Sequence, residues 1–225
     1  MHAVHPVKRR LLLYLIAALL WPLLLPVQAQ QSVTAEVLAN RIDKRYNALH
    51  SLEVHFTQQY QGMGMNRRES GTLLLKKPGK MRWTYEQPAG KLFVLDGKDG
   101  YFYSPGDSEA QRVPAKSLDD MRSPLRLLLG HTQLMKELTG VTIQLNADGI
   151  YKLTGIPKGL EKRVSVFSLT ATADGVIQSL RIEETDGITN IFTFSSEKPN
   201  PPATDAAFVF TPPAGVNVVN GMPPA

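Results

Sequence analysis

Few side chains in this 225-residue chain have types and spacing that suit them to chemistry. The chain has no cysteine, which excludes a thiol nucleophile, a thiolate metal site and a disulfide framework. Beyond the N-terminal His2 and His5, its histidines are His50, His55 and His131, and no two of them have the spacing of metal ligands on one helical turn. We therefore expect these histidines at the surface or in the core, and neither a metal ion nor another cofactor.

A second candidate for chemistry is the sequence Gly106-Asp107-Ser108-Glu109, which is similar to the opening motif of some serine esterases. Those enzymes take a catalytic histidine from a later Asp-x-x-His sequence. This chain contains neither Asp-x-x-His nor the Gly-x-Ser-x-Gly elbow of other esterases. Because the motif follows Pro105, it predicts a polar hairpin turn, and a secreted esterase that uses Ser108 is the alternative of another class. We expect the protein not to be an enzyme.

The first thirty residues have the three-part pattern of a secretory signal. Lys8, Arg9 and Arg10 precede an apolar run that begins at Leu11, and small residues precede a cleavage site after Ala29. The alternative, a membrane anchor, needs roughly 18 apolar residues, and this run has only about fifteen. The sequence thus predicts a cleaved signal peptide at residues 1–29 and one domain at residues 30–225. No cysteine is present for lipid attachment, so the released protein is expected to be soluble.

The charge of the mature chain is close to neutral. The formal net charge of +5 falls to +2 when residues 1–29 are removed, because three cations and no acid lie in that segment. Proteins that bind nucleic acid carry concentrated basic stripes. We therefore expect no nucleic-acid partner.

The hydrophobic pattern changes from helical to extended early in the domain. Apolar residues recur every three or four positions between Ser32 and Leu49, which predicts an amphipathic helix. From Leu52 to Tyr60 they alternate with polar residues, as in a strand with one buried face. Further strands bounded by turn residues are predicted at residues 72–77, 81–85, 92–95, 101–103, 141–145, 151–153, 164–170, 178–184 and 188–194.

The interval between residues 117 and 138 is helical instead. Ser123-Pro124 supplies an N-cap and a first-turn proline, Gly130 ends the leucine-rich helix, and a second short helix is expected over residues 133–138. The fold class is therefore mainly β: an antiparallel meander of about 10–11 strands that curls into a barrel or half-barrel, with an N-terminal helix and a short helical insert.

Three stretches together resemble the outer-membrane lipoprotein carrier family (LolA). They are VHFTQQY at residues 54–60; GTLLLKKPGKMRWTYEQP at 71–88, which is followed by LDGKDGYFYSP at 95–105; and FVFTPPAGVNVV at 208–219. The helical SPLRLLLG at 123–130 occupies the place of the family's lid helix. The resemblance covers nearly all of the mature chain, with the order and spacing of the elements preserved.

The resemblance implies an unclosed antiparallel β-barrel whose short lid helices cover an apolar cavity. It implies a periplasmic chaperone that accepts acylated lipoproteins from an ATP-driven release complex in the inner membrane and hands them to an outer-membrane acceptor. We expect a monomer. The alternative on the same fold is a carrier or sensor of free lipid or glycolipid.

Strand parity, together with the family's inward-facing positions, nominates the residues of the site. The expected acyl-chain cavity is lined by Phe56, Leu73, Leu75, Met81, Trp83 and Tyr85. The expected lid residues are Leu125, Leu128 and Leu129. Where the family usually has an arginine that holds the lid through hydrogen bonds to helix backbone, this chain has Lys77, which offers three donors on a flexible stem. We expect Lys77 to act as the lid latch with a looser closed state; the alternative is an ordinary surface lysine.

Overall fold

The computed structural model describes residues 33–119 and 132–221, so the expected signal peptide lies outside the described residues. Helix α1 (Ala35–Asn47) confirms the amphipathic helix. The hydroxyl of Thr34 caps it by accepting a hydrogen bond from the Val37 N–H at 3.2 Å. Its apolar face, which includes Leu38, Ile42 and Tyr46, is buried.

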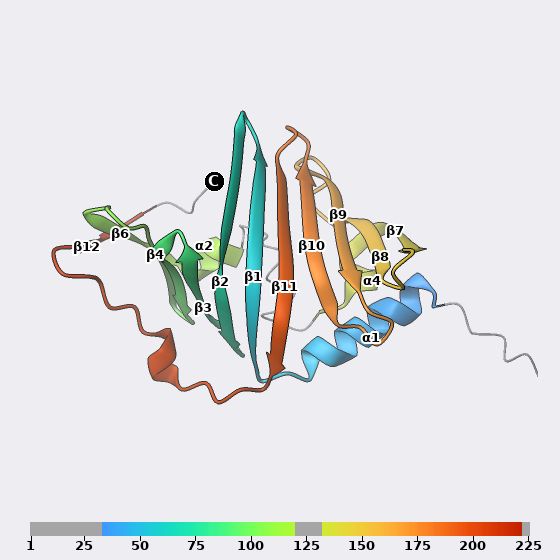
Figure 1. The fold of residues 1–225 in the computed structure, drawn as a ribbon, viewed down its shortest axis with the longest axis horizontal. Helices are drawn as coiled ribbons and strands as arrows, with labels where there is room; N and C mark the ends of the chain where they lie inside the picture. Colours follow the sequence, from blue (N-terminus) through green and yellow to red (C-terminus); the bar gives the residue numbers. More distant parts are fainter. Residues whose placement is uncertain (1–32, 120–131, 222–225) are drawn as a thin grey trace, which may run out of the picture. The chain divides into compact units, whose positions relative to one another are not determined.

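The described residues form one unclosed sheet of twelve strands (Figure 1). The strands are β1 (Ser51–Gly62), β2 (Met65–Lys76), β3 (Lys80–Gln87), β4 (Ala89–Asp96), β5 (Asp99–Tyr103), β6 (Glu109–Pro114), β7 (Leu138–Leu145), β8 (Tyr151–Pro157), β9 (Val164–Ala171), β10 (Ile177–Glu184), β11 (Thr189–Pro199) and β12 (Asn217–Asn220). Their order is β12-β6-β5-β4-β3-β2-β1-β11-β10-β9-β8-β7. Two antiparallel meanders therefore meet where β1 pairs with β11, and β12 adds to β6 in parallel.

The mainly β, unclosed architecture confirms the predicted fold class. All ten predicted strand segments are present, and β6 and β12 are two further strands that the sequence pattern did not reveal. Of the helical insert, the structure describes α2 (Ala115–Asp119) and α4 (Leu134–Glu137), the second of which confirms the short helix expected over residues 133–138. The segment expected to form the lid, with Leu125, Leu128 and Leu129, lies outside the described residues.

The face of the sheet that packs with α1 is here called the inner face, and it is continuous across the centre of the sheet. The β1–β2 register runs without a shift from Ser51 opposite Lys76 to Gly62 opposite Met65. Alternate residues of these strands therefore keep to one side. One buried apolar cluster joins the inner-face side chains of β1, β2 and β3 to Leu38 and Ile42 of α1.

Residues 200–221, here called the C-terminal strap, run over the opposite face of β3, β4 and β5 and end as β12 at the edge of β6. Its 3-10 helix η2 (Asp205–Phe208) is fixed by the Asp205 carboxylate, which lies 2.6 Å from Lys76 Nζ and 2.9 Å from Lys80 Nζ. Phe208 is buried, and Phe210 stacks on Tyr101 with ring centroids 5.1 Å apart.

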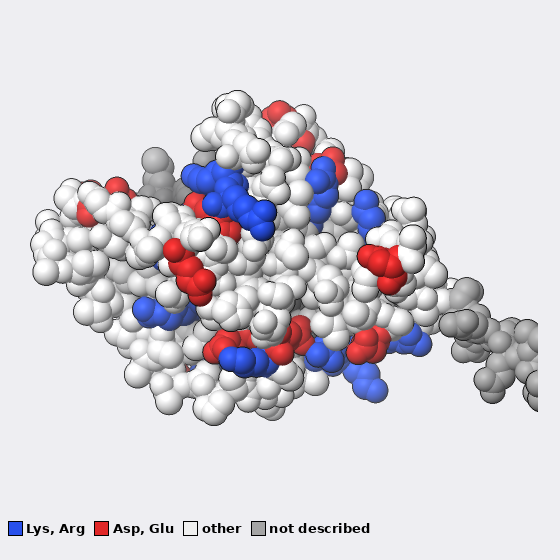
Figure 2. Space-filling view, viewed as in Figure 1, with Lys and Arg blue, Asp and Glu red and all other residues white. Residues whose placement is uncertain are grey.

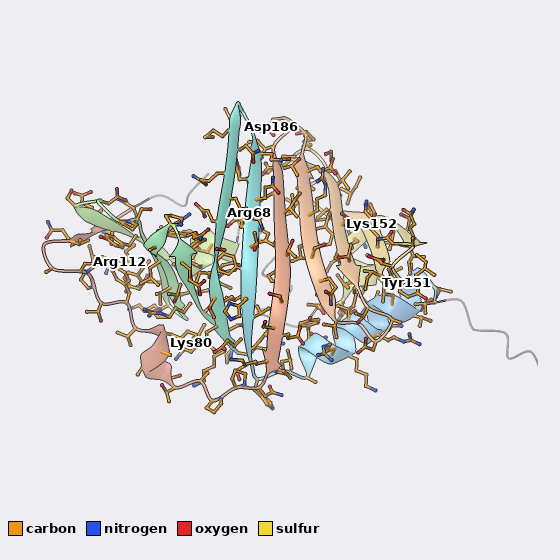
Figure 3. The ribbon with its side chains drawn as sticks, viewed as in Figure 1. Arg68, Lys80, Arg112, Tyr151, Lys152 and Asp186 are labelled. Atoms are coloured by element: carbon orange, nitrogen blue, oxygen red, sulfur yellow. The ribbon has the colours of Figure 1, made fainter. Side chains whose placement is uncertain are left out.

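The strap and the charges can be followed in two further views. Figure 3 labels Lys80 and Arg112, which hold the two ends of the strap; Arg112 donates to the Asn220 side-chain oxygen at 2.7 Å. In Figure 2, basic and acidic side chains are interspersed over the visible face, and no single sign dominates it.

Candidate functional site

The structure brings together the six residues expected to line the cavity. Phe56, Leu73, Leu75, Met81 and Trp83 are each at most 3% exposed and belong to the buried cluster, and Tyr85 packs against it half-buried. They come from three adjacent strands, in which Leu73 pairs with Trp83 and Leu75 with Met81. The residues share the inner face, and their role in binding an acyl chain is taken up below as a proposal.

Aromatic rings form the middle of this surface. Phe56 meets the edge of Trp83 at 4.5 Å and of Tyr85 at 5.2 Å between ring centroids, and Trp83 meets Phe192 at 5.8 Å. The indole N–H of Trp83 donates to the sulfur of Met81 at 3.1 Å, so this buried donor is satisfied within the cluster. The surface is thus apolar and needs no polar partner from outside.

Sequence reasoning missed Phe192 and Phe194, which extend the aromatic surface onto β11. They stack on each other with ring centroids 6.4 Å apart, and Phe194 lies directly opposite Phe56 in the sheet. The alternation within β11 could have placed both rings on one face. The pairing of β11 with β1 could not be derived from it, because these strands are separated by most of the chain.

Gly71 is required where β3 bulges toward β2. A Cβ atom at this position would lie 2.1 Å from the Thr84 carbonyl oxygen, far inside van der Waals contact. The register between the two strands shifts at this point, between Ser70 and Gly71. The missing side chain therefore lets the backbone of β3 approach and lets Tyr85 pack beside Phe56.

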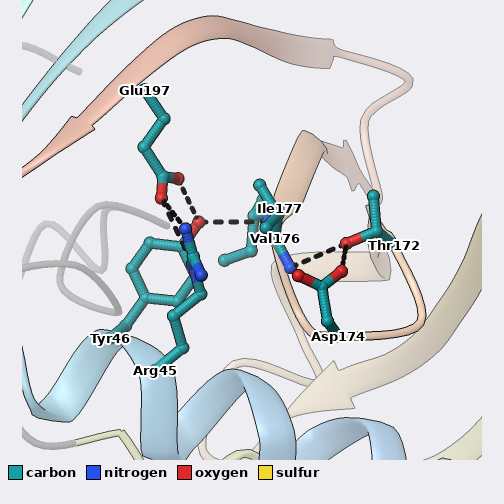
Figure 4. A network of polar contacts seen from close by, with 7 residues as sticks. All are labelled: Arg45, Tyr46, Thr172, Asp174, Val176, Ile177 and Glu197. Atoms are coloured by element: carbon teal, nitrogen blue, oxygen red, sulfur yellow. Dashed lines mark hydrogen bonds and ion pairs between the residues drawn. The ribbon is translucent and has the colours of Figure 1, made fainter.

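Helix α1 is fastened over the inner face by polar contacts at its C-terminal end (Figure 4). The Tyr46 hydroxyl donates to Glu197 Oε2 at 2.7 Å and accepts from the Ile177 N–H at 3.1 Å, and Arg45 pairs with the same carboxylate at 2.6 Å. Burial, followed by the neighbouring Glu197 charge, raises the pKa of Tyr46 well above its usual value. The tyrosine therefore stays protonated and acts as a donor to the carboxylate.

Lys77 contributes a further contact at the same end of α1. Its Nζ atom donates to the Tyr46 carbonyl oxygen at 2.5 Å, and burial lowers the pKa of the ammonium group. The lysine thus binds helix backbone, as the latch prediction required, and the helix it binds is α1. The segment expected to form the lid lies outside the described residues, so the latch role stays a prediction.

Two other side chains of α1, Asp43 and Asn47, form hydrogen bonds with the residues around the start of α4. Asn47 and the Thr132 backbone exchange two hydrogen bonds, of 2.7 and 2.9 Å, and the Asp43 carboxylate accepts from the Leu134 N–H at 3.1 Å. Thr132 is buried, and its hydroxyl also contacts Asp43. Helix α1 is therefore bound both by the residue that follows β2 and by the residues around the start of α4.

The groups considered for catalysis do not come together in the described residues. Ser108 lies exposed in the turn between β5 and β6, and its carbonyl oxygen accepts from the Asn217 N–H at 3.0 Å. His55 is exposed on β1, His50 is exposed in the turn after α1, and His131 lies outside the described residues. Within residues 33–119 and 132–221, no three His, Asp or Glu side chains gather as metal ligands, and no helix is long and apolar enough to cross a membrane.

The family model and the sequence relatives agree on one family. Residues 47–211 match the family model described as outer membrane lipoprotein carrier protein LolA. The outer-membrane lipoprotein carrier protein of Nitrosomonas europaea is 31% identical over 68% of this chain and 73% of its own length. The protein of the same name from Cupriavidus taiwanensis is 28% identical over 85% of this chain and 92% of its own.

A solved structure supports the fold. The crystal structure of an uncharacterized conserved protein from Thermus thermophilus superposes with a TM-score of 0.53 at 14% identity, covering 83% of this chain and 99% of that one. The sequence matches span the strands of both meanders and the beginning of the C-terminal strap. This chain therefore belongs to the LolA family of outer membrane lipoprotein carrier proteins.

Proposed function

We propose that this protein is a periplasmic carrier that accepts acylated lipoproteins released from the inner membrane, shields their acyl chains on its inner face and delivers them to an outer-membrane acceptor. Family membership and the names of its relatives support a lipoprotein carrier. The observation that carries the proposal is the continuous aromatic and aliphatic inner face, which forms one buried cluster with the apolar side chains of α1. The proposed activity is binding and release without a covalent step.

The size of the hydrophobic effect explains why such a carrier is needed. Burial of an acyl chain contributes about 0.8 kcal/mol per CH₂ group, so one sixteen-carbon chain holds a lipoprotein to a membrane by roughly 12 kcal/mol. Two or three chains make escape into water negligible. A carrier must therefore offer a replacement apolar surface that it can also surrender.

The contacts of α1 are compatible with a helix that can leave the inner face when cargo binds. We propose that acyl chains replace the apolar face of α1 on the inner face, so that little apolar area is left in water during the exchange. The contacts at the C-terminal end of α1, from Lys77 and Glu197, are polar and water can replace them at modest cost. In this proposal Lys77 is the latch, and the expected lid residues Leu125, Leu128 and Leu129 add to the cover.

The proposal includes the remaining expectations for the chain. Residues 1–29 would direct secretion and be removed, and residues 30–225 would work as a monomer. Its partners would be the acylated cargo, an ATP-driven release complex of the inner membrane and an acceptor at the outer membrane. None of these steps requires a cofactor on the carrier.

The experiment uses inner-membrane vesicles loaded with a labelled triacylated lipoprotein. After addition of ATP and the mature protein, the cargo is expected in the soluble fraction as a one-to-one complex, and unacylated cargo is expected not to bind. If the vesicles release cargo to a known carrier and none to this protein, the proposal is wrong.

The same complex tests the inner face with two neighbouring positions on β3. A photo-crosslinking amino acid in place of Tyr85 is expected to label the acylated cargo, whereas the same group in place of the exposed Thr84 is not. Equal labelling at both positions would argue against the inner face as the binding surface.

Two further measurements address the alternatives. Lipids extracted from protein purified out of a native periplasm would identify a carrier or sensor of free lipid or glycolipid. Hydrolysis of a short-chain ester that disappears in Ser108→Ala would identify an esterase.

A further inference from the structure

The inner face changes from apolar to polar on four strands near the centre of the sheet, β4, β2, β1 and β11. On β2 the inner-face positions pass from Leu73 through Gly71 to Glu69 and Arg67, and on β4 they pass from Phe93 to Lys91. The change continues on β1 and β11, and on β11 it lies one inner-face position further along, because Phe192 is opposite Gln58. On β1, Phe56 is followed by Gln58 and Tyr60; on β11, Phe192 is followed by Asn190 toward the β10–β11 turn.

Glu69 is the centre of this boundary. Its side chain is only 5% exposed, yet it carries a carboxylate that lies 2.6 Å from Lys91 Nζ and 3.1 Å from Arg67 Nε. Burying a carboxylate costs several kcal/mol unless partners compensate it. Here two cations surround one anion, which leaves the group with a formal charge of +1 beside an apolar surface.

The two cations are held in place on aromatic rings. Lys91 Nζ lies 4.5 Å from the ring centroid of Tyr85, and the Arg67 guanidinium carbon lies 5.6 Å from that of Tyr60. Tyr85 itself touches Phe56 at the edge of the apolar surface. The cations are therefore positioned where a chain lying along Phe56 would leave the apolar surface.

Arg67 has N–H donors that its ion pair with Glu69 does not use. Its Nε atom faces Glu69, and the hydrogen bonds among residues 33–119 and 132–221 use neither of its terminal nitrogens. The side chain is 58% exposed, so those terminal N–H groups are accessible. A guanidinium fork binds paired oxygen acceptors better than a single point charge does.

We propose that Arg67 and Lys91, fixed by the buried Glu69, form a subsite for the ester and amide carbonyl oxygens that join the acyl chains to a bound cargo. This inference rests on the proposed function, because it places the acyl chains on the apolar inner face. The chemistry fits: carbonyl oxygens only accept hydrogen bonds, and the cluster presents only donors to solvent. The subsite fixes where the apolar chain ends and the polar part of the cargo begins.

The test measures how substitution of each of two arginines changes the binding of two ligands. One ligand is a short lipopeptide with two palmitoyl esters, and the other is its dihexadecyl ether analogue, which lacks the ester carbonyl oxygens. Arg67→Gln removes the donors, and Arg68→Gln is the matched control, because Arg68 lies next in β2 on the other face (Figure 3). Binding is measured by titration calorimetry, and thermal unfolding checks that each variant is folded.

Arg67→Gln is expected to weaken binding of the ester ligand about tenfold and to change binding of the ether ligand less than twofold. Arg68→Gln is expected to change neither, and Arg67→Lys is expected to recover part of the loss. An equal effect of Arg67→Gln on both ligands would overturn the subsite. A wild-type protein that binds neither ligand would overturn the proposed function instead.

A third ligand separates two sources of the same chemistry. Dipalmitoyl phosphatidylglycerol carries similar ester linkages on a phospholipid. The same Arg67 dependence for the lipopeptide and the phospholipid would support a subsite for diacylglyceryl esters. If the Arg67 substitution weakens binding of the phospholipid and not of the lipopeptide, the assignment to acylated cargo is wrong.

Discussion

The Nζ atom of Lys77, the residue after β2, lies 2.5 Å from the backbone carbonyl oxygen of Tyr46 in the last turn of α1. Carbonyl groups in the last turn of a helix lack partners within the helix, and a cation there interacts favourably with the helix dipole. The same tyrosine is held through its hydroxyl by Glu197. The carbonyl group of Tyr46 therefore binds α1 to the meander that contains β2, and its hydroxyl group binds α1 to the meander that contains β11.

Lys77→Leu is expected to loosen this end of α1. The loss of one charge-assisted hydrogen bond is expected to lower the free energy of unfolding by about 1–2 kcal/mol and cargo transfer several-fold. Lys77→Arg is the control and is expected to keep transfer, because it retains a donor at the same place. Transfer that is unchanged in Lys77→Leu would rule out the latch.

Tyr46→Phe is expected to destabilise the protein by about 1–3 kcal/mol, because it leaves the buried Ile177 N–H without its partner and takes a donor from Glu197. Tyr60→Phe is the matched control: within the described residues the hydroxyl of the half-buried Tyr60 makes no hydrogen bond. Chemical denaturation measures both. Equal effects of the two substitutions would contradict a special role for the Tyr46 hydroxyl.

Leu73 and Leu74 are neighbours on opposite faces of β2, which gives a direct test of where the core lies. Leu73 is fully buried, so Leu73→Ala is expected to cost about 2–5 kcal/mol of unfolding free energy. Leu74 is half-buried, and Leu74→Ala is expected to cost about 1 kcal/mol. Urea unfolding curves measure the difference, and a reversed order would mean that the faces are misassigned.

Asp205 makes the attachment of the C-terminal strap depend on pH. Hydrogen bonds from Lys76 and then Lys80 lower the pKa of this carboxyl group from 3.8 to about 2. Because the folded-state pKa is below the unfolded value, its stabilisation is present above pH 3.8 and is lost as the pH falls toward 2. NMR titration of the carboxyl carbon is expected to give the low pKa, and Lys76→Gln is expected to raise it toward 3.8. An unshifted wild-type titration would contradict the ion pairs.

The sequence predicted the local elements well because each carries its own pattern. Alternation from Leu52 to Tyr60 and helical spacing from Ala35 to Leu49 are local properties, and both elements formed as expected. Strand β6 was missed because Glu109, Arg112 and Pro114 interrupt its pattern. Strand β12 was missed because it has only four residues and pairs with a strand about a hundred residues earlier.

The candidate site could be predicted only in part. Alternation grouped the residues of β2 and β3 by face and the family resemblance indicated which face is the inner one, whereas the contribution of Phe192 depended on the distant pairing of β1 with β11. Arg67 and Glu69 resemble ordinary surface residues of a hairpin in the sequence. Their burial and their contact with Lys91 arise only from the assembled sheet.

The pairing of β1 with β11 also dictates the order in which this chain can fold. Phe56 pairs with Phe194, 138 positions later, so one edge of the central strand has no partner until β11 has been synthesised. Contacts between such distant segments give a high contact order, which slows folding, and an unpaired apolar strand edge invites aggregation. The strands that bear the aromatic inner face must therefore be kept apart from other chains during synthesis, so this protein is expected to depend on a folding helper until β11 is available.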